Sequence, residues 1–243
     1  MPFRTQLLLG RYQLGAVTFE NLSVVATRKE DGWNLGLQNS KISGDVLIPH
    51  NPDFPMSVQL QQLFLETAQN DSIVTEGQGK NSRMDFDLRQ LPLANIAVGE
   101  LFINAEHWGS IEFDIKPNGQ GVLFDNIKGN IRGMEIHHQD KLDAGAELSW
   151  QTTESGQQSR FVGKLTTKNM AEVLRHWKKP EMVESQSAQI LVDINWLSAP
   201  QNFHLVDVAG LLELKLIEGR FHRDATAGDG LLRLMSVLNF DSL

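Results

Sequence analysis

The chain has 243 residues, with 22 lysines and arginines against 30 aspartates and glutamates, and a formal net charge of −8 at pH 7. This negative balance disfavours non-specific binding to nucleic acid and to anionic lipid surfaces, because both need a basic face. The absence of cysteine excludes disulfides, cysteine metal sites and thiol catalysis. Hydrophobic residues make up 41%, so the chain has enough apolar surface to fold and disorder is not expected.

No segment of the sequence has the features of a membrane anchor or a signal peptide. The early apolar run at residues 7–9 is bracketed by Arg4 and Arg11. A signal peptide needs roughly 7–15 apolar residues and a spanning helix about 20. The chain is therefore either cytosolic or an internal piece of a longer protein. The strand-like opening and the apolar segment at 237–240, with no terminating signal after it, favour an internal piece.

Most of the sequence alternates between apolar and polar residues with a period of two. This pattern predicts strands with one dry and one wet face. In chain order, the runs lie at residues 22–26, 35–37, 46–48, 84–88, 111–115, 134–136, 142–150, 190–196 and 212–216.

Residues that favour turns separate these runs at intervals of about 10–15 residues, which is typical of a meander. The sequence shows no long helices between the strands, so we expect antiparallel pairing and a mostly β protein. The turn signals are Asp31-Gly32, Ser43-Gly44, Glu76-Gly77, Pro117-Asn118-Gly119, Lys128-Gly129-Asn130, Ser155-Gly156 and Glu218-Gly219.

Two or three short helices are expected among the strands. At residues 169–179, Asn169 is placed to cap a helix, an apolar stripe follows at helical spacing, and Pro180 ends it. A second helix is predicted near 230–238, after a glycine-rich step. A third candidate is residues 60–69, where the pair Gln61-Gln62 breaks the alternation of a strand.

So few helices cannot cover the dry face of more than ten strands. That face must be covered by a second sheet, by helices or by an apolar layer that is not protein. The sheet is therefore expected either to fold onto itself as a sandwich or barrel, or to stay open as a long curved groove or trough.

The sequence contains no nucleophile elbow, phosphate-binding loop or zinc motif. The adjacent His137 and His138 would point to opposite faces of a strand, so a shared metal ion is not expected. Asp224 and Asp229 lie near one loop and could form a glycosidase pair, but solvated carboxylates are the simpler interpretation. We expect no enzyme activity, no metal and no cofactor.

The five tryptophans could suggest sugar-binding platforms, but four of them continue apolar stripes and indicate a core. These four are Trp33, Trp150, Trp177 and Trp196. Trp108, which precedes Gly109, fits no stripe and has no assignment from the sequence.

The last third of the sequence has a distinctive order of elements. A strand at 161–169 leads into the short helix, and the strand at 190–196 ends in Trp196. A strand closing on Gly219-Arg220-Phe221 follows, and Gly228-Asp229-Gly230 then starts a leucine-rich segment. This order resembles the C-terminal region of the YhdP-like members of the AsmA-like family of Gram-negative envelope proteins. The sequence departs from the family's Pro-Gly step at residues 197–200, which affects a turn.

The specific part of the resemblance covers about residues 160–238, and a weaker part extends back to about residue 20. It implies a division into residues 1–160, the N-terminal part of a β-groove, and residues 161–243, an AsmA-like C-terminal region. It also implies a periplasmic part of an inner-membrane-anchored protein that carries phospholipid toward the outer membrane without covalent catalysis. The implied partners are phospholipid acyl chains and other envelope proteins.

If the groove is open, acyl chains would form the apolar layer that the protein lacks. The alternative is a closed apolar core, in which case the region would be a rigid envelope scaffold or docking domain, with the helix at 169–179 as a docking patch. The candidate lipid-groove residues are Ile111, Phe113, Ile115, Ala144, Ala146, Leu148, Ile190, Val192, Ile194, Leu212, Leu214 and Leu216.

Overall fold

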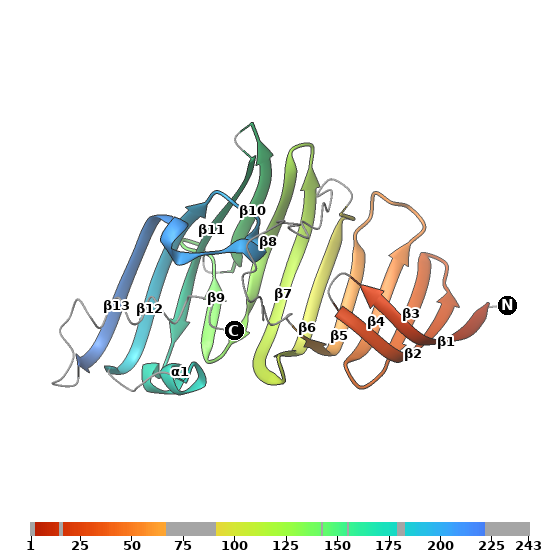
Figure 1. Ribbon diagram of the computed structural model, residues 1–243, viewed down its shortest axis with the longest axis horizontal. Coiled ribbons are helices and arrows are strands. Elements are labelled where there is room, and N and C mark those ends of the chain that lie inside the picture. Colours follow the sequence, from red (N-terminus) through yellow and green to blue (C-terminus); the bar gives the residue numbers. More distant parts are fainter. Residues whose placement is uncertain are drawn as a thin grey trace, which may run out of the picture.

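A computed structural model describes residues 3–14, 17–66, 91–141, 143–154, 156–178 and 183–221. In this part of the chain, thirteen strands form a single sheet, which confirms the predicted mostly-β class. Figure 1 shows the strands side by side from β1 at one end to β13 at the other. The strands are β1 (Arg4–Leu14), β2 (Val17–Arg28), β3 (Gly32–Gln38), β4 (Ile42–Pro49), β5 (Met56–Leu65), β6 (Ala94–Ile103), β7 (Glu106–Asn118), β8 (Gly121–Ile131), β9 (Met134–His137), β10 (Ala146–Thr153), β11 (Gly156–Thr167), β12 (Val183–Trp196) and β13 (Ala209–Phe221).

The order of the strands follows the chain except at β9, a short strand that pairs with both β8 and β11. The pairs are antiparallel apart from β5 and β6, which are parallel. The expectation of antiparallel pairing is therefore wrong for this pair. Parallel neighbours need a crossover of a dozen or more residues. Residues 67–90 of this connection lie outside the described part, and so does the run predicted at 84–88.

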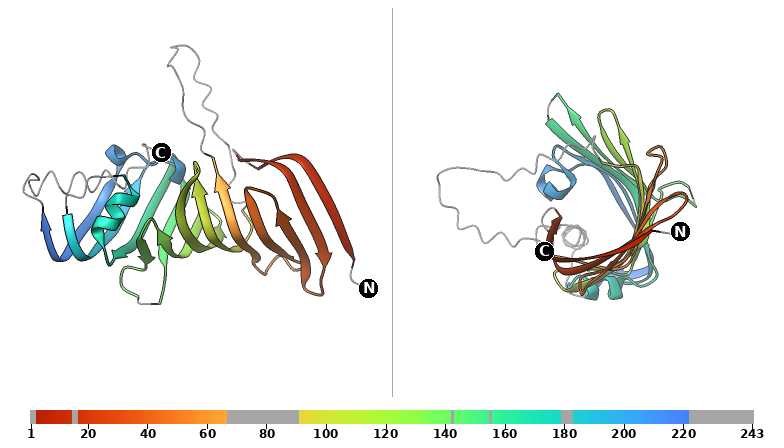
Figure 2. Two further views of the ribbon diagram at one scale, coloured as in Figure 1. Left: turned by 90° about the horizontal axis from the view of Figure 1, so that it is seen from below. Right: turned by 90° about the vertical axis from the view of Figure 1, so that its right-hand side faces the viewer.

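The sheet is open, because β1 and β13 are the two ends of the strand order and are not paired with each other. Figure 2 shows that it curls around its long axis into a trough with a curved cross-section. This shape confirms the predicted long, curved, groove-like sheet. The proposed boundary between residues 160 and 161 falls inside β11, which pairs with β10 and β12. The division into two regions stays a prediction from the resemblance.

One α-helix, α1 (Met170–His176), lies in the described residues, within the range predicted at 169–179. Its N-cap is Asn169, whose side-chain oxygen accepts a hydrogen bond from the Glu172 backbone nitrogen at 3.2 Å. Two short 3₁₀ helices, η2 (Pro200–Asn202) and η3 (Leu205–Asp207), follow β12. The helix predicted near 230–238 lies outside the described residues.

The third helix candidate, at residues 60–69, is wrong over residues 60–65, which belong to β5. Its interrupted alternation marks a β-bulge. Ser43 of β4 is opposite Gln62 and Gly44 is opposite Leu60, so Gln61 is an extra residue on β5. A bulge and a helix start disturb the period of two in the same way.

Several turn signals also lie inside strands. Ser43-Gly44, Lys128-Gly129-Asn130 and Glu218-Gly219 belong to β4, β8 and β13, whereas the predicted turn at 117–119 does join β7 to β8. At Gly129, φ is +154° and a Cβ atom would lie 2.1 Å from the Ser110 carbonyl oxygen of β7. Glycine is needed there for close approach between strands. The run predicted at 142–150 also starts too early, since β10 begins at Ala146.

Candidate functional site

The two faces of β12 differ in chemistry. Successive side chains of a strand point to opposite faces, so Ile190 and Val192 lie on one face and Leu191 and Asp193 on the other. Ile190 is 6% exposed and Val192 3%. We call the face that carries Ile190 the apolar face of the sheet.

The register of the strands extends the apolar face across the sheet, because residues directly opposite each other share a face. Leu214 of β13 and Leu165 of β11 are both opposite Ile190. Eleven of the twelve candidate groove residues share the apolar face: Ile111, Phe113, Ile115, Ala146, Leu148, Ile190, Val192, Ile194, Leu212, Leu214 and Leu216. Their contact with lipid stays a prediction.

Ala144 is the exception. It precedes β10, and its carbonyl oxygen accepts a hydrogen bond from the His138 backbone nitrogen at 2.8 Å. The residue belongs to the loop between β9 and β10 and to no strand. Sequence alternation places it on the apolar stripe only because the predicted strand begins too early.

The apolar face lies on the concave side of the trough. At one end of β12, the Trp196 indole nitrogen donates to the Ala199 carbonyl oxygen at 3.2 Å. The Trp196 ring also meets Phe203 edge to face, with 5.1 Å between centroids. Figure 2 shows η2, which lies between these two contacts in the chain, inside the curve of the sheet. The face that carries Trp196 and Ile190 is therefore the concave one.

The same face continues over the N-terminal half of the sheet, where the sequence identified fewer candidates. Val58 of β5 lies opposite Val46 of β4 and beside Ile96 of β6, so all three point to the concave side. A buried cluster forms around this part of the face, composed of Phe19, Leu22, Ile42, Leu60, Val98, Leu101 and Trp108. The contribution of β5 was missed because its bulge disturbs the alternation.

The convex face carries charged and polar side chains. The Arg160 guanidinium holds Asp193 through two hydrogen bonds of 2.9 and 2.8 Å, and Lys116 pairs with Asp125. These bonds lower the pKa of both aspartates, and burial opposes the shift. The charges therefore lie outside the trough, where water and salt reach them.

Additional segments cover the concave face at two places. At one, α1 buries Met170, Val173 and Leu174, each 1% exposed, against Ile190 and Val192. At the other, Ala199 packs with a cluster of Ala94, Ile115, Val122 and Trp150. Several candidate groove residues outside the fully buried set, including Phe113, Leu148 and Leu212, are intermediate in exposure.

A buried cation fixes the end of α1. The side chain of Arg132, in the β8–β9 turn, is 5% exposed and its guanidinium carbon lies 4.3 Å from the Trp108 ring centroid and 5.1 Å from that of Trp177. It donates to the His176 carbonyl oxygen at 3.1 Å and pairs with Glu106. This packing gives a structural role to Trp108, which the sequence left unexplained.

Glu106 also pairs with Lys178, just beyond α1. The hydrogen bond from Lys178, and then that from Arg132, lower the pKa of Glu106, while desolvation opposes the shift. The sequence missed this cluster because its members come from β7, the β8–β9 turn and the end of α1. The one available signal was the unassigned Trp108 beside Gly109.

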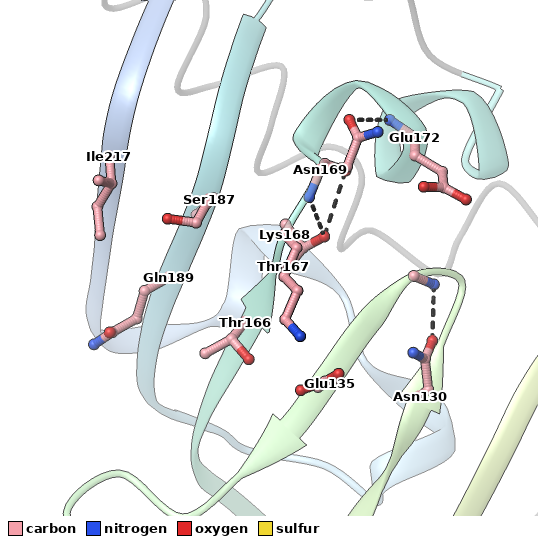
Figure 3. A pocket seen from close by; sticks show the side chains of 12 residues that line it. Asn130, Glu135, Thr166, Thr167, Lys168, Asn169, Glu172, Ser187, Gln189 and Ile217 are labelled. Atoms are coloured by element: carbon pink, nitrogen blue, oxygen red, sulfur yellow. Dashed lines mark hydrogen bonds between the residues drawn. The ribbon is translucent and has the colours of Figure 1, made fainter.

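A pocket of about 430 Å³, lined mostly by polar residues, lies beside the start of α1. Figure 3 shows that its side chains come from β8, β9, β11, β12, β13 and the start of α1 with its Asn169 cap. Thr166 and Gln189 belong to the convex face, while Glu135 and Glu172 contribute carboxylates. Several of its polar atoms are already bonded locally, as between Thr167 and Asn169.

The described residues contain no group of three or more histidines, cysteines or carboxylates that could hold a metal ion. His137 contacts the Thr166 hydroxyl at 3.1 Å, and the His138 Nδ1 accepts hydrogen bonds from the following loop. Asp224 and Asp229 lie outside the described part of the chain. None of the helices that the structure describes is long and apolar enough to cross a membrane.

The fold and the site define a class of protein: an open β-trough with an apolar concave face and a charged convex face. The family model described as "YhdP protein" matches residues 1–243. The chain belongs to the YhdP family, which is an AsmA-like family of envelope proteins and not a known enzyme family. Comparison with curated proteins and with solved structures finds no significant match.

Proposed function

We propose that this chain is a periplasmic, lipid-conducting segment of an inner-membrane-anchored YhdP-family protein. Its concave face would carry phospholipid acyl chains between the inner and outer membranes, with no covalent step. The single observation that supports this is the continuous apolar stripe that runs from β4 to β13 on the concave side.

The concave face would shield the acyl chains from water. Each CH₂ group of a lipid tail costs about 0.8 kcal/mol when exposed to water, so transfer of a free lipid through an aqueous compartment is strongly disfavoured. A continuous apolar surface removes most of that cost at every position. The polar convex face would let the same sheet stay hydrated on its other side.

Adjacent residues of β10 provide a matched test. Leu148 points to the concave face and is opposite Phe161, whereas Ser149 points to the convex face and is opposite Arg160. Leu148→Asp places a charge on the proposed lipid path, and Ser149→Asp places the same charge outside it. Ala146 is less suitable, because it is fully buried beside Gly163 and a substitution there would disturb packing.

The purified chain should retain phospholipid in native mass spectrometry after exposure to phosphatidylethanolamine and phosphatidylglycerol. Leu148→Asp should reduce the amount of bound lipid at least tenfold, while the thermal unfolding of the variant remains cooperative. Ser149→Asp should bind as the unmodified chain does. Absence of bound lipid in the unmodified chain would contradict the proposal and favour the scaffold with a closed apolar core.

A further inference from the structure

The concave face is not evenly exposed. A row of half-buried apolar side chains runs through the middle of this face, one from each of seven neighbouring strands from β5 to β12. Because the row crosses the strands, it follows the long axis of the trough (Figure 1). We call this row the lane, and its members are Val58, Ile96, Phe113, Phe124, Leu148, Phe161 and Ile194.

The register of the strands joins the members of the lane within each half of the sheet. In β5 to β7, each member pairs directly with the next, in the order Val58, Ile96 and Phe113. The same holds in β8 to β12 for Phe124, Leu148, Phe161 and Ile194. Each half of the lane is therefore a straight file of adjacent side chains.

The two halves of the lane meet at an aromatic pair. A register shift between Glu112 and Asp114 places Phe124 opposite Ile115 and not opposite Phe113. The rings of Phe113 and Phe124 nevertheless meet edge to face, with 5.9 Å between their centroids. The lane is therefore continuous across the irregularity, and this pair is its crossing point.

Buried side chains flank the lane. In β8 to β12, the row on one side is at most 8% exposed and consists of Val122, Trp150, Ser159 and Trp196. The row on the other side is also buried and consists of Ile127, Ala146, Gly163 and Val192. Ala199 packs against the first row and α1 against the second. In β5 and β6, the buried Leu60 and Val98 flank the lane on one side.

The lane is narrow, and its side chains carry no polar atom. Residues on one face of a strand are about 6.7 Å apart, so the two buried rows lie about 13 Å apart from centre to centre. An α-helix measures about 10–12 Å across and exceeds the space that the side chains of these rows leave between them. An extended peptide would leave its backbone N–H and C=O groups without partners. A hydrocarbon chain is narrower and needs no hydrogen bond, so it is the occupant that fits.

We propose that acyl chains between β5 and β12 travel along the lane and not across the whole concave face, and that they cross between its halves over Phe113 and Phe124. The assignment rests on the function proposed above and names the side chains that determine what fits. Among the candidates identified from the sequence, the lane contains Phe113, Leu148 and Ile194. The lipid contacts that it adds are Val58, Ile96, Phe124 and Phe161.

The test uses the unmodified full chain and phosphatidylethanolamine that carries a diazirine near the end of one acyl chain. After irradiation and proteolysis, mass spectrometry locates the labelled residues. Lane residues such as Phe161 should carry roughly tenfold more label than Leu165 of β11 and Leu214 of β13, because apolar contact with the chain is concentrated on the lane. Both leucines are half-buried on the same face, but they pack against the cluster that α1 covers.

Adjacent residues of β5 provide a matched pair of variants. Val58 lies on the lane, whereas Ser57 points to the convex face and is opposite Leu47. Val58→Asp should lower the label on Ile96 roughly tenfold, because a charge beside an acyl chain loses its hydration. Ser57→Asp should leave that label unchanged. Labelling of the unmodified chain needs no substitution, so it tests the lane even if Val58→Asp fails to fold.

The possible results separate the lane from the function on which it rests. Equal labelling of Phe161, Leu165 and Leu214 would overturn the lane while leaving lipid binding intact. Undiminished labelling of Ile96 in a folded Val58→Asp chain would do the same. A chain that neither retains lipid in native mass spectrometry nor becomes labelled would overturn both proposals.

Discussion

The guanidinium carbon of Arg132 lies 4.3 Å from the centroid of the Trp108 ring, in a position typical of a cation–π contact. The side chain is 5% exposed, and its charge is compensated by Glu106. Through its hydrogen bond to the His176 carbonyl oxygen, Arg132 also attaches the end of α1 to the β8–β9 turn. One buried cation thus fixes the helix that covers part of the concave face.

Removal of this cation should loosen the attachment of α1. We expect Arg132→Ala to lower the free energy of unfolding by about 3 kcal/mol, because it removes the cation–π contacts with two tryptophan rings and leaves the His176 carbonyl oxygen and Glu106 without their donor. Urea unfolding followed by tryptophan fluorescence measures this. Arg11→Ala is the control, since its ion pair is exposed and should contribute less than about 1 kcal/mol. Equal effects of the two changes would contradict the assignment.

The pairing of Glu106 predicts a dependence of stability on pH. Its pKa is lowered in the folded state, so the carboxylate contributes stability that is present above the unfolded pKa, 4.5, and is lost as pH falls through the folded value. Glu106→Gln should therefore reduce the urea midpoint at pH 7, and the difference from the unmodified chain should shrink below pH 4.5.

A second glutamate of β7 provides the comparison for that experiment. Glu112 is exposed and lies on the convex face. Glu112→Gln should have little effect on the urea midpoint at pH 7. If the urea midpoint of Glu106→Gln stayed equally far below that of the unmodified chain at pH 3, the pairing of Glu106 with Lys178 and Arg132 would not be the cause of the lower stability.

At Gly129, β7 and β8 approach so closely that a side chain should destabilise the fold. A methyl group at this position would collide with the Ser110 carbonyl oxygen, 2.1 Å away. We expect Gly129→Ala to destabilise the fold by about 3 kcal/mol, a magnitude typical of backbone strain combined with overpacking. Gly119, in the β7–β8 turn, has no atom within 4 Å of its Cβ position, so Gly119→Ala should be close to neutral. Thermal denaturation of the two variants gives the comparison.

Tryptophan fluorescence gives an independent probe of lipid on the concave face. Trp33 lies on this face, opposite Ile48 of β4, and is only partly buried. Phospholipids that carry bromine on their acyl chains quench indole fluorescence on contact, so they should lower the emission of the chain, whereas unbrominated lipids should not. Trp33→Phe should reduce the quenched fraction. Identical emission with both lipids would argue against acyl chains in the trough.

Local alternation was sufficient to predict one-sided strands, because the period of two depends only on which face is dry. Ile190, Val192 and Ile194 lie where that pattern places them. It could not reveal the parallel pairing of β5 with β6, since pairing direction depends on the route of the connection. It also misread the bulge at Gln61 as a helix, because both features interrupt the same period.

The Arg132 cluster was beyond prediction for a different reason. Arg132 is 26 residues from Glu106 and 44 from His176, and arginine in a turn is ordinarily exposed. Only the curled sheet and the docked helix bring these groups together. Likewise, no pattern in the sequence distinguishes a leucine that would contact lipid from one that packs in a core.

Site-specific photo-crosslinking at adjacent positions of β12 tests the central claim most directly. A photoreactive amino acid at Ile194, on the concave face, should capture phospholipid in intact cells, and the same group at Asn195, on the convex face, should not. Mass spectrometry of the crosslinked chain identifies the adduct. The expected result is a phospholipid adduct at Ile194 and none at Asn195. Capture of protein alone at Ile194, or of lipid equally at both positions, would contradict it.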